Sequence, residues 1–144
     1  AKVARRFGVK PRVAMLSFSN FGTSSEMRTD RVEEAISIAR ELDPDLIIDG
    51  PMQADTALVP EIQKEYPFMS FDGPANILIC PNLASANIAY KLLQRIAGAE
   101  MTGPILEGLS KPAHVLQRGD SVRDVVHMAA ICAVDAQRHD WQKL

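Results

Sequence analysis

The sequence has few cysteines, no excess of basic charge and no long apolar run, and each of these absences argues against a class of protein. Its two cysteines, Cys80 and Cys132, lie far apart in apolar stretches, so neither CxxC redox chemistry nor a zinc site is indicated, and two free thiols are expected. The formal net charge of −2 gives no basic face for nucleic acid. No apolar run approaches the roughly 20 residues that span a bilayer, and the beginning lacks a signal-peptide core, so we expect a cytoplasmic protein with no membrane partner.

The sequence does contain enough apolar residues to form one core. With 144 residues, of which 47% are hydrophobic and 24% charged, the chain has the size and composition of a single globular domain. It begins with Ala1 rather than Met, inside a predicted helix. We therefore expect it to be a piece of a longer protein.

Short apolar runs alternate along the chain with segments of helical periodicity. Strands are predicted at residues 13–18, 46–49 and 76–80, the second of them ended by the turn residues 49–51. Helices are predicted at residues 1–7, 27–42, 54–58 and 60–65, then between Asn82 and Gly98, and from Ser121 onward. This alternation predicts an α/β fold with a mostly parallel sheet flanked by helices.

The last two predicted helices each carry an apolar stripe that we expect to be buried. The stripes consist of Ile88, Ala89, Leu92, Leu93 and Ile96 in the first helix, and of Val122, Val125, Val126, Ala129, Ala130, Ala133 and Val134 in the second. Two short extended segments are predicted between these helices, at residues 100–106 and 113–116. Because ligands of α/β sheets collect where strands end and helices begin, the candidate ligand segments are residues 17–25, 49–55 and 117–124.

Five short strings, in order, give the chain a family resemblance. They are MLSFSNFG at residues 15–22, DGPMQAD at 49–55, ANIAYK at 86–91, GPIL at 103–106 and LQRG at 116–119. Together they resemble the phosphate acetyltransferase and butyryltransferase family, and the match covers nearly the whole chain. The resemblance implies a two-lobed phosphotransacetylase (isocitrate-dehydrogenase-like) fold, of which residues 1–144 form a carboxy-terminal portion.

Within that family, the chain is most similar to the branch fused to bacterial NADP-dependent malic enzymes. Residues 19–22 read Ser-Asn-Phe-Gly, where stand-alone transferases usually have Ser-Thr-Lys-Gly, and the last helix ends in AVDAQ at residues 133–137. This resemblance implies that malate-binding and NADP-binding domains lie upstream and are absent here, and that NADP and a divalent metal belong to them. It also implies that acetyl-CoA or CoA is the ligand of this portion, and that the chain forms a homodimer and a higher oligomer in the full-length protein.

The resemblance gives Asp124 the role of the catalytic aspartate, which takes the proton from the CoA thiol. The residues themselves offer a second interpretation. Ser121 and Asp124 have the spacing of a capping box, in which the serine and the acid satisfy free backbone groups at a helix start. Both roles can coexist in one side chain.

Two arginines match residues of the family's active site. Arg118 stands just before a helix amino terminus, where backbone N–H groups already favour an anion, and its alternative is an ordinary surface ion pair. Arg95 matches an arginine that contacts CoA, or it lies on a solvated helix face. Gln117 departs from the family, because active members carry a serine there as an oxyanion donor, and losing such a donor costs about 10²- to 10³-fold in rate.

The loop after the first strand is the remaining candidate. Ser17, Ser19 and Asn20 could offer hydroxyl, amide and backbone groups to phosphate or CoA, although small polar residues after a strand are also common turn chemistry. Asp49 is interpreted as a strand-ending residue and Asp55 as a possible helix cap. The three histidines, at positions 114, 127 and 139, show no ligand or triad pattern, and surface or structural roles are predicted for them.

Three functions follow from these residues. In the first, the chain is a regulatory module that binds acetyl-CoA and alters a distant malate-oxidising site, as Gln117, Asn20 and Phe21 favour. In the second, it is a working phosphate acetyltransferase, as Asp124, Arg118 and Arg95 favour. In the third, the fragment alone only folds and self-associates.

Overall fold

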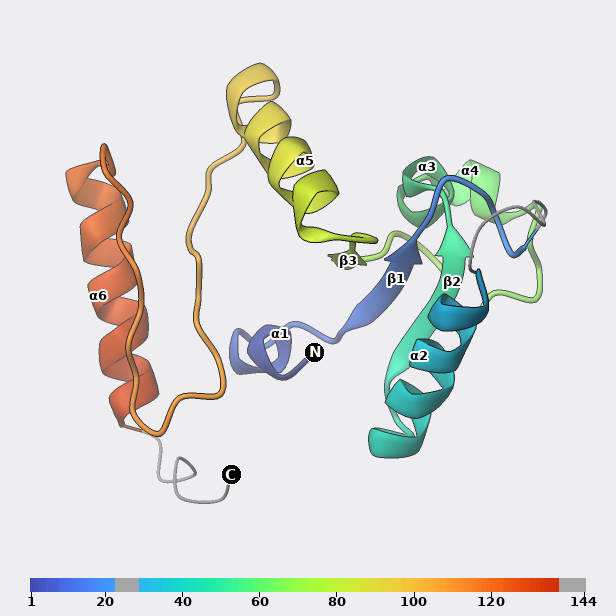
Figure 1. Ribbon diagram of the computed structural model, residues 1–144, viewed down its shortest axis with the longest axis horizontal. Helices are drawn as coiled ribbons and strands as arrows, with labels where there is room; N and C mark the ends of the chain where they lie inside the picture. Colours follow the sequence, from blue (N-terminus) through green and yellow to red (C-terminus); the bar gives the residue numbers. More distant parts are fainter. Residues whose placement is uncertain (23–28, 138–144) are drawn as a thin grey trace. The chain divides into compact units, whose positions relative to one another are not determined.

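The computed structural model describes residues 1–22 and 29–137 and divides the chain into two compact units, Ala1–Lys91 and Leu92–Leu144. The boundary falls inside one helix, α5 (Leu83–Ile96). Figure 1 shows the elements along the chain, which we describe unit by unit. None of the described helices is both long enough and apolar enough to cross a membrane.

The first unit is built on a parallel sheet of three strands in the order β2-β1-β3 (Figure 1). The strands are β1 (Arg12–Leu16), β2 (Ile47–Met52) and β3 (Ile77–Ile79). The helices of this unit are α1 (Lys2–Arg6), α2 (Thr29–Leu42), α3 (Ala54–Leu58), α4 (Pro60–Gln63) and the first part of α5. The predicted α/β class and parallel sheet are thus confirmed.

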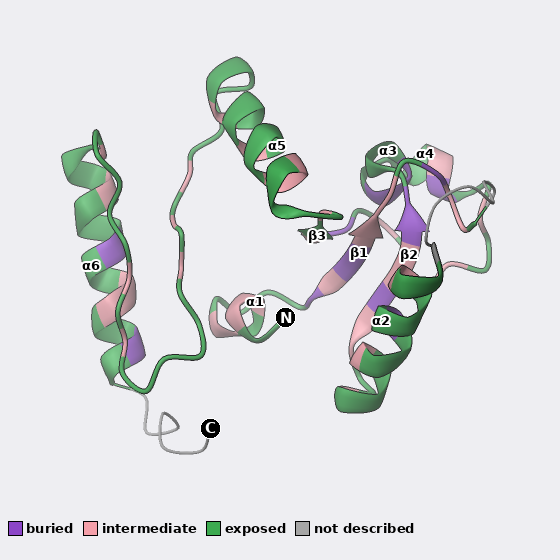
Figure 2. Cartoon of the chain, viewed as in Figure 1, coloured by how far each residue is buried: buried purple, intermediate pink, exposed green. Residues whose placement is uncertain are grey.

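The central strand β1 separates two small cores, because successive side chains of a strand point to opposite faces. Val13 lies in one core and Ala14 in the other, and both are buried (Figure 2). The Val13 core also contains Ile36 of α2 and Ile48 of β2. The Ala14 core also contains Met52, Ala57, Phe71 and Ala75.

The predicted end of the second strand at Asp49 is wrong. Strand β2 continues through Gly50 and Pro51, which are joined by a cis peptide bond, to Met52, and the register against β1 shifts between Ala14 and Leu16. Gly50 has φ +136°, and a Cβ added there would lie 2.6 Å from the backbone oxygen of Met15. Turn residues therefore lie within the strand here, because a glycine lets β1 and β2 approach closely.

The second unit contains the end of α5, a long segment without regular structure at residues 97–120, and α6 (Val122–Ala136). Ser121 is the N-cap of α6, as predicted. The predicted extended segments at 100–106 and 113–116 form no strand. They lie instead within the irregular segment, the later part of which runs along α6 (Figure 1).

The predicted burial of the two apolar stripes is wrong, because every residue of both stripes is exposed. On α5, Ile88, Leu92, Leu93 and Ile96 are exposed, and on α6 the same holds for Val122, Val126 and Val134 (Figure 2). The buried residues of α6 are Met128 and Asp135. Because α6 is apolar on most of its surface, the sequence pattern could not show which side the irregular segment would cover.

We predict that Gly50→Ala lowers the free energy of unfolding by at least about 2 kcal/mol, because the new methyl group adds a backbone clash to an unfavourable φ. Gly73→Ala is the matched control: Gly73 also has positive φ, but nothing lies within 4 Å of its added Cβ, and we expect a loss of about 1 kcal/mol. Chemical denaturation measures both variants. Equal losses would contradict the close approach of the strands.

Candidate functional site

The loop after β1 is fastened to the end of β2 by its backbone. The N–H of Ser17 donates to the carbonyl oxygen of Met52 at 2.8 Å, and the N–H of Phe21 donates to that of Pro51 at 2.7 Å. These two N–H groups are therefore already engaged within the protein. Of the predicted ligand segment 17–25, residues 23–25 lie outside the described residues.

Asn20 connects this loop to two other parts of the first unit. Its Oδ1 accepts from the backbone N–H of Gln53 at 2.7 Å, and its Nδ2 donates to the Tyr66 hydroxyl at 3.1 Å. Gln53 in turn donates through Nε2 to the carbonyl oxygen of Phe18 at 2.6 Å. The Asn20 amide thus has a structural role, which the sequence analysis missed because Gln53 and Tyr66 are distant in the chain, and its predicted contact with CoA or phosphate stays a prediction.

Phe21 is held in the left-handed region, with φ +48°. Its ring lies 5.1 Å from the ring of Tyr66 and 4.8 Å from that of Phe68, measured between centroids. A non-glycine residue pays a conformational cost at this φ. The aromatic contacts and the N–H bond to Pro51 offset that cost.

Ser19 is the most buried of the predicted loop residues, with 7% of its surface exposed. Its Oγ finds no hydrogen-bond partner among the described residues, while Ser17 is half-buried. A buried hydroxyl without a partner is unusual in a folded protein. The structure thus places Ser17, Ser19 and Asn20 together in the first unit, at the carboxyl end of β1.

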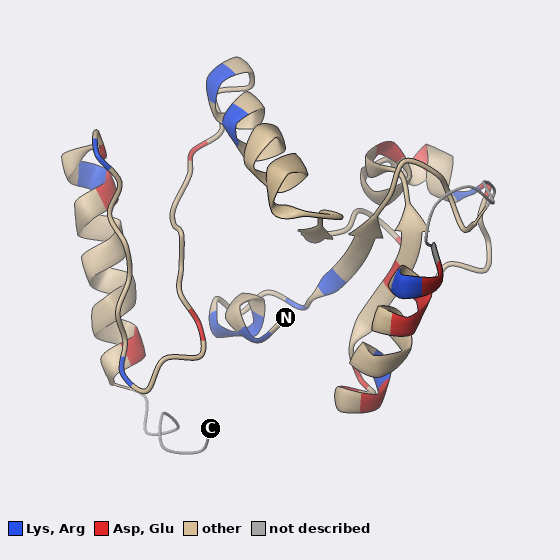
Figure 3. Ribbon diagram, viewed as in Figure 1, with Lys and Arg blue, Asp and Glu red and all other residues tan. Residues whose placement is uncertain are grey.

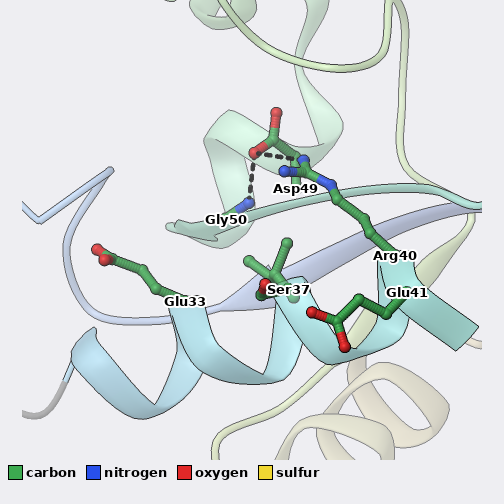
Figure 4. A pocket seen from close by; sticks show the side chains of 7 residues that line it. Glu33, Ser37, Arg40, Glu41, Asp49 and Gly50 are labelled. Carbon is green, nitrogen blue, oxygen red and sulfur yellow. Dashed lines mark hydrogen bonds and ion pairs between the residues drawn. The ribbon is translucent and has the colours of Figure 1, made fainter. Parts of the chain in front are cut away.

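Asp49 joins β2 to its surroundings rather than ending the strand. Its Oδ1 accepts from the N–H of Gly50 at 2.9 Å and lies 3.8 Å from Arg40, and its Oδ2 accepts from the N–H of Ser70 at 2.6 Å. Asp49 and Arg40 border a cavity of about 390 Å³ beside α2 (Figure 4). No group of His, Cys, Asp and Glu in the described ranges could hold a metal ion. We therefore assign Asp49 a structural role.

Asp124 occupies the capping box at the start of α6. Its Oδ2 accepts from the N–H of Ser121 at 2.8 Å and from the Ser121 hydroxyl at 2.7 Å, and the Asp124 N–H lies 3.2 Å from the same hydroxyl. The hydrogen bond from the Ser121 side chain, followed by that from its backbone, lowers the pKa of Asp124 below the ordinary 3.8. The predicted capping role is thus confirmed. Since both hydrogen bonds from Ser121 fall on Oδ2, Oδ1 is the oxygen that could take a proton from a ligand.

Gln117 and Arg118 lie in a tight turn just before α6. The N–H of Gln117 donates to the Asp120 carboxylate at 2.6 Å, and the N–H of Asp120 donates back to the carbonyl oxygen of Gln117 at 3.1 Å. Gly119, with φ +94°, allows the turn. The Arg118 side chain is exposed and makes no hydrogen bond or ion pair with the described residues, so it is available to an anion.

Two other arginines of the second unit, Arg123 and Arg95, differ in their surroundings. Arg123 pairs with Glu100 at 2.7 Å on the surface, a contact that contributes about 0 to 1 kcal/mol. Arg95 is exposed in the last turn of α5. Figure 3 shows that the charges of α6 lie near its ends and leave its middle uncharged. The predicted residues Gln117, Arg118 and Asp124 therefore gather at the amino end of α6.

One contact in the second unit, between His114 and Asp135, was not predicted from the sequence. The His114 Nε2 lies 3.3 Å from Asp135 Oδ2, and the two side chains are only 2% and 6% exposed. The sequence predicted a surface or structural histidine, and the structural role is the right one for His114. His127 is exposed, and His139 lies outside the described residues.

Comparison with known proteins now decides the family. The family model described as "Phosphate acetyl/butaryl transferase" matches residues 1–133. The chain belongs to this family. It is 50% identical over 131 residues to a phosphate acetyltransferase of Acetivibrio thermocellus, covering 90% of this chain and 40% of that protein.

Two further relatives show the same relation. The chain is 46% identical over 140 residues to an NADP-dependent malic enzyme of Salmonella typhimurium, covering 95% of this chain and 18% of that protein. A phosphotransacetylase structure from Streptococcus pyogenes superimposes with a TM-score of 0.87 at 43% identity, covering 94% of this chain and 42% of that one. The chain thus spans less than half the length of these relatives, and a family domain common to both kinds of protein is established.

We predict that Ser121→Ala raises the pKa of Asp124 towards its ordinary value, because the side-chain hydrogen bond that contributes most to the lowering is lost. A lowered carboxylate pKa stabilises the folded state above the unfolded-state pKa, and this stabilisation is lost as the pH falls through the folded-state pKa. The acid-induced loss of stability that depends on Asp124 should therefore shrink in Ser121→Ala. Carboxyl NMR titration and thermal unfolding between pH 2 and 7, the range about the ordinary carboxyl pKa, measure this.

The exposed Ser110 supplies the control. Ser110→Ala should leave the titration of Asp124 and the loss of stability at low pH as in the wild type. An unchanged Asp124 titration in Ser121→Ala would contradict the capping geometry.

Proposed function

We propose that this chain is the carboxy-terminal, phosphotransacetylase-like portion of an NADP-dependent malic enzyme and that it binds acetyl-CoA as a regulatory ligand. Similarity over 95% of the chain to a malic enzyme supports this placement. The parent reaction would be the oxidative decarboxylation of malate to pyruvate and CO2. NADP and a divalent metal would bind upstream domains, and the protein would be cytoplasmic and oligomeric, with a homodimer through this portion.

The observation that carries the proposal is the composition of the site at the amino end of α6. Arg118 offers an exposed cation beside the positive end of a helix of 15 residues, which favours a phosphate-bearing ligand. The family resemblance implies that Gln117 stands where active members carry an oxyanion-binding serine. The Asp124 carboxylate is engaged by Ser121 and has a lowered pKa, which makes it a weaker base for a thiol. The site is therefore better suited to binding an acyl-CoA than to transferring its acyl group.

Regulation requires a coupling free energy between the acyl-CoA site and the malate-oxidising site, typically about 1 to 3 kcal/mol. Such coupling is reciprocal for binding, so malate or NADP should change the affinity for acetyl-CoA by the same factor as acetyl-CoA changes theirs. A finite limit to this mutual shift in affinity at saturating ligand separates coupling between two sites from competition for a single site, because competition shifts the apparent affinity without limit.

A second function, phosphate acetyl transfer, is favoured by a specific observation. Arg118 lies in the turn just before α6, and Asp124 lies in the first turn of α6. The Oδ1 of Asp124 accepts neither of the hydrogen bonds that Ser121 donates. Relatives named phosphate acetyltransferase reach 50% identity. The transfer would form acetyl phosphate and free CoA from acetyl-CoA and phosphate.

We expect acetyl-CoA to change the rate of malate oxidation by the full-length protein in a saturable way, at fixed malate and NADP. Arg118→Ala should abolish this change or raise the half-saturating concentration at least about tenfold, because a charge-assisted contact is lost. Arg123→Ala is the matched control, since Arg123 is a nearby arginine paired with Glu100, and its response should stay within about twofold of wild type. A rate of malate oxidation that does not change with acetyl-CoA concentration would disprove the regulatory function.

We further expect the wild-type protein to form no measurable acetyl phosphate from acetyl-CoA and phosphate, and Gln117→Ser to gain activity. Restoring one oxyanion donor is worth up to about 10²- to 10³-fold in rate. A hydroxamate assay for acetyl phosphate measures both proteins, and Gln117→Ala controls for the removal of the amide alone. Substantial activity in the wild type would instead support the transferase function.

A further inference from the structure

The buried pair His114 and Asp135 joins the irregular segment of the second unit to α6. Besides its 3.3 Å approach to Asp135, the imidazole accepts the N–H of Leu106 through Nδ1 at 3.3 Å. The Cys132 thiol donates to the carbonyl oxygen of Pro112 at 3.8 Å in the same region. The segment is thus tied to the carboxyl half of α6 at more than one point.

The hydrogen bond from Leu106 fixes the protonation pattern of His114. An Nδ1 that accepts a backbone N–H carries a lone pair, so the neutral ring has its proton on Nε2. That nitrogen lies 3.3 Å from the Asp135 carboxylate oxygen Oδ2, and since neither atom forms a hydrogen bond with the described residues, the contact is electrostatic. The imidazole therefore connects the Leu106 backbone to α6.

The segment that joins His114 to the amino end of α6 is only just long enough to span that distance. Asp135 lies about 21 Å along the helix from Ser121, because an α-helix rises about 1.5 Å per residue. The chain from His114 to Ser121 can reach at most about 25 Å when fully extended, and the turn between Gln117 and Asp120 shortens it. The position of His114 along α6 therefore restricts where Arg118 can lie.

We propose that His114 and Asp135 are positioning residues. They hold the segment before Arg118 in an extended path along α6 and so place the Arg118 guanidinium for an acyl-CoA. This inference rests on the proposed function, because Arg118 is the group that would contact the ligand. The pair lies at the far end of α6 from Arg118 and acts only through the segment that joins them. Its loss should weaken acyl-CoA binding without changing the response of the protein once the ligand is bound.

Three substitutions separate the two contacts of the imidazole. The Oδ1 of His114→Asn can replace Nδ1 as the acceptor for Leu106, whereas the amide of His114→Gln can replace Nε2 towards Asp135, and Asp135→Asn removes the carboxylate charge. In the full-length protein, we expect each to weaken acetyl-CoA binding about tenfold by calorimetry. The maximal change in malate oxidation at saturating acetyl-CoA should remain as in the wild type.

A double-mutant cycle tests whether the pair acts through Arg118. Adding His114→Gln or Asp135→Asn to Arg118→Ala should cause no further loss of acetyl-CoA affinity, because the group that they position is already gone. Met128→Ala removes a buried apolar side chain from α6 and controls for destabilisation. It should lower the melting temperature at least as much as the polar variants and leave acetyl-CoA affinity within about twofold.

The outcomes separate the positioning role from the proposed function. If the wild type binds acetyl-CoA and Arg118→Ala weakens it, but the His114 and Asp135 variants bind normally or add their losses to that of Arg118→Ala, positioning is disproved and the proposed function stands. An affinity loss in Met128→Ala equal to theirs would also disprove it. If the wild type does not bind acetyl-CoA, the proposed function fails and the positioning role fails with it.

Discussion

The arrangement of β1, β2 and the loop after β1 in the first unit depends on the close approach of Met15 and Gly50. Because the Gly50 position would bring any Cβ to within 2.6 Å of the Met15 oxygen, only glycine lets β2 continue beside β1 as far as Met52. That continuation places the carbonyl groups of Pro51 and Met52 where they receive the N–H groups of Phe21 and Ser17. The loop after β1, with the predicted residues Ser17, Ser19 and Asn20, thus depends on a contact between strands that only the absence of a Cβ atom at Gly50 allows.

The second unit uses a different device to hold its candidate site. The described part of the second unit contains no strand, and Gln117, Arg118 and Asp124 lie in a turn and in the first turn of α6. The capping box fixes Asp124 locally, and the reciprocal bonds between Gln117 and Asp120 fix the turn. The catalytic role proposed for Asp124 would use the same carboxylate as the capping box, so the hydrogen bonds that stabilise the helix also lower the basicity that an acyl transfer would need.

Local chemistry made several features predictable. The spacing of Ser121 and Asp124 gave the start of α6, and short apolar runs gave the three strands, since both depend on near neighbours in the chain. The predicted end of the second strand was wrong, because the Gly50-Pro51 dipeptide, which is typical of turns, lies inside β2. The bonds from Asn20 to Gln53 and Tyr66, and the contact of His114 with Asp135, join residues far apart in the chain, and no periodicity announces such contacts.

The sequence by itself determined the family, the parallel α/β class and the helix cap, because motif strings, apolar runs and cap spacing are local properties that hold in any context. Only the tertiary structure decided which side of α6 is buried and which polar groups are already engaged. An almost uniformly apolar helix leaves its orientation to packing, and a hydrogen bond commits a side chain only when folding brings its partner near. Arg118 could therefore be named from the sequence as a candidate, whereas the contacts of His114 with Leu106 and Asp135 became visible only in the fold.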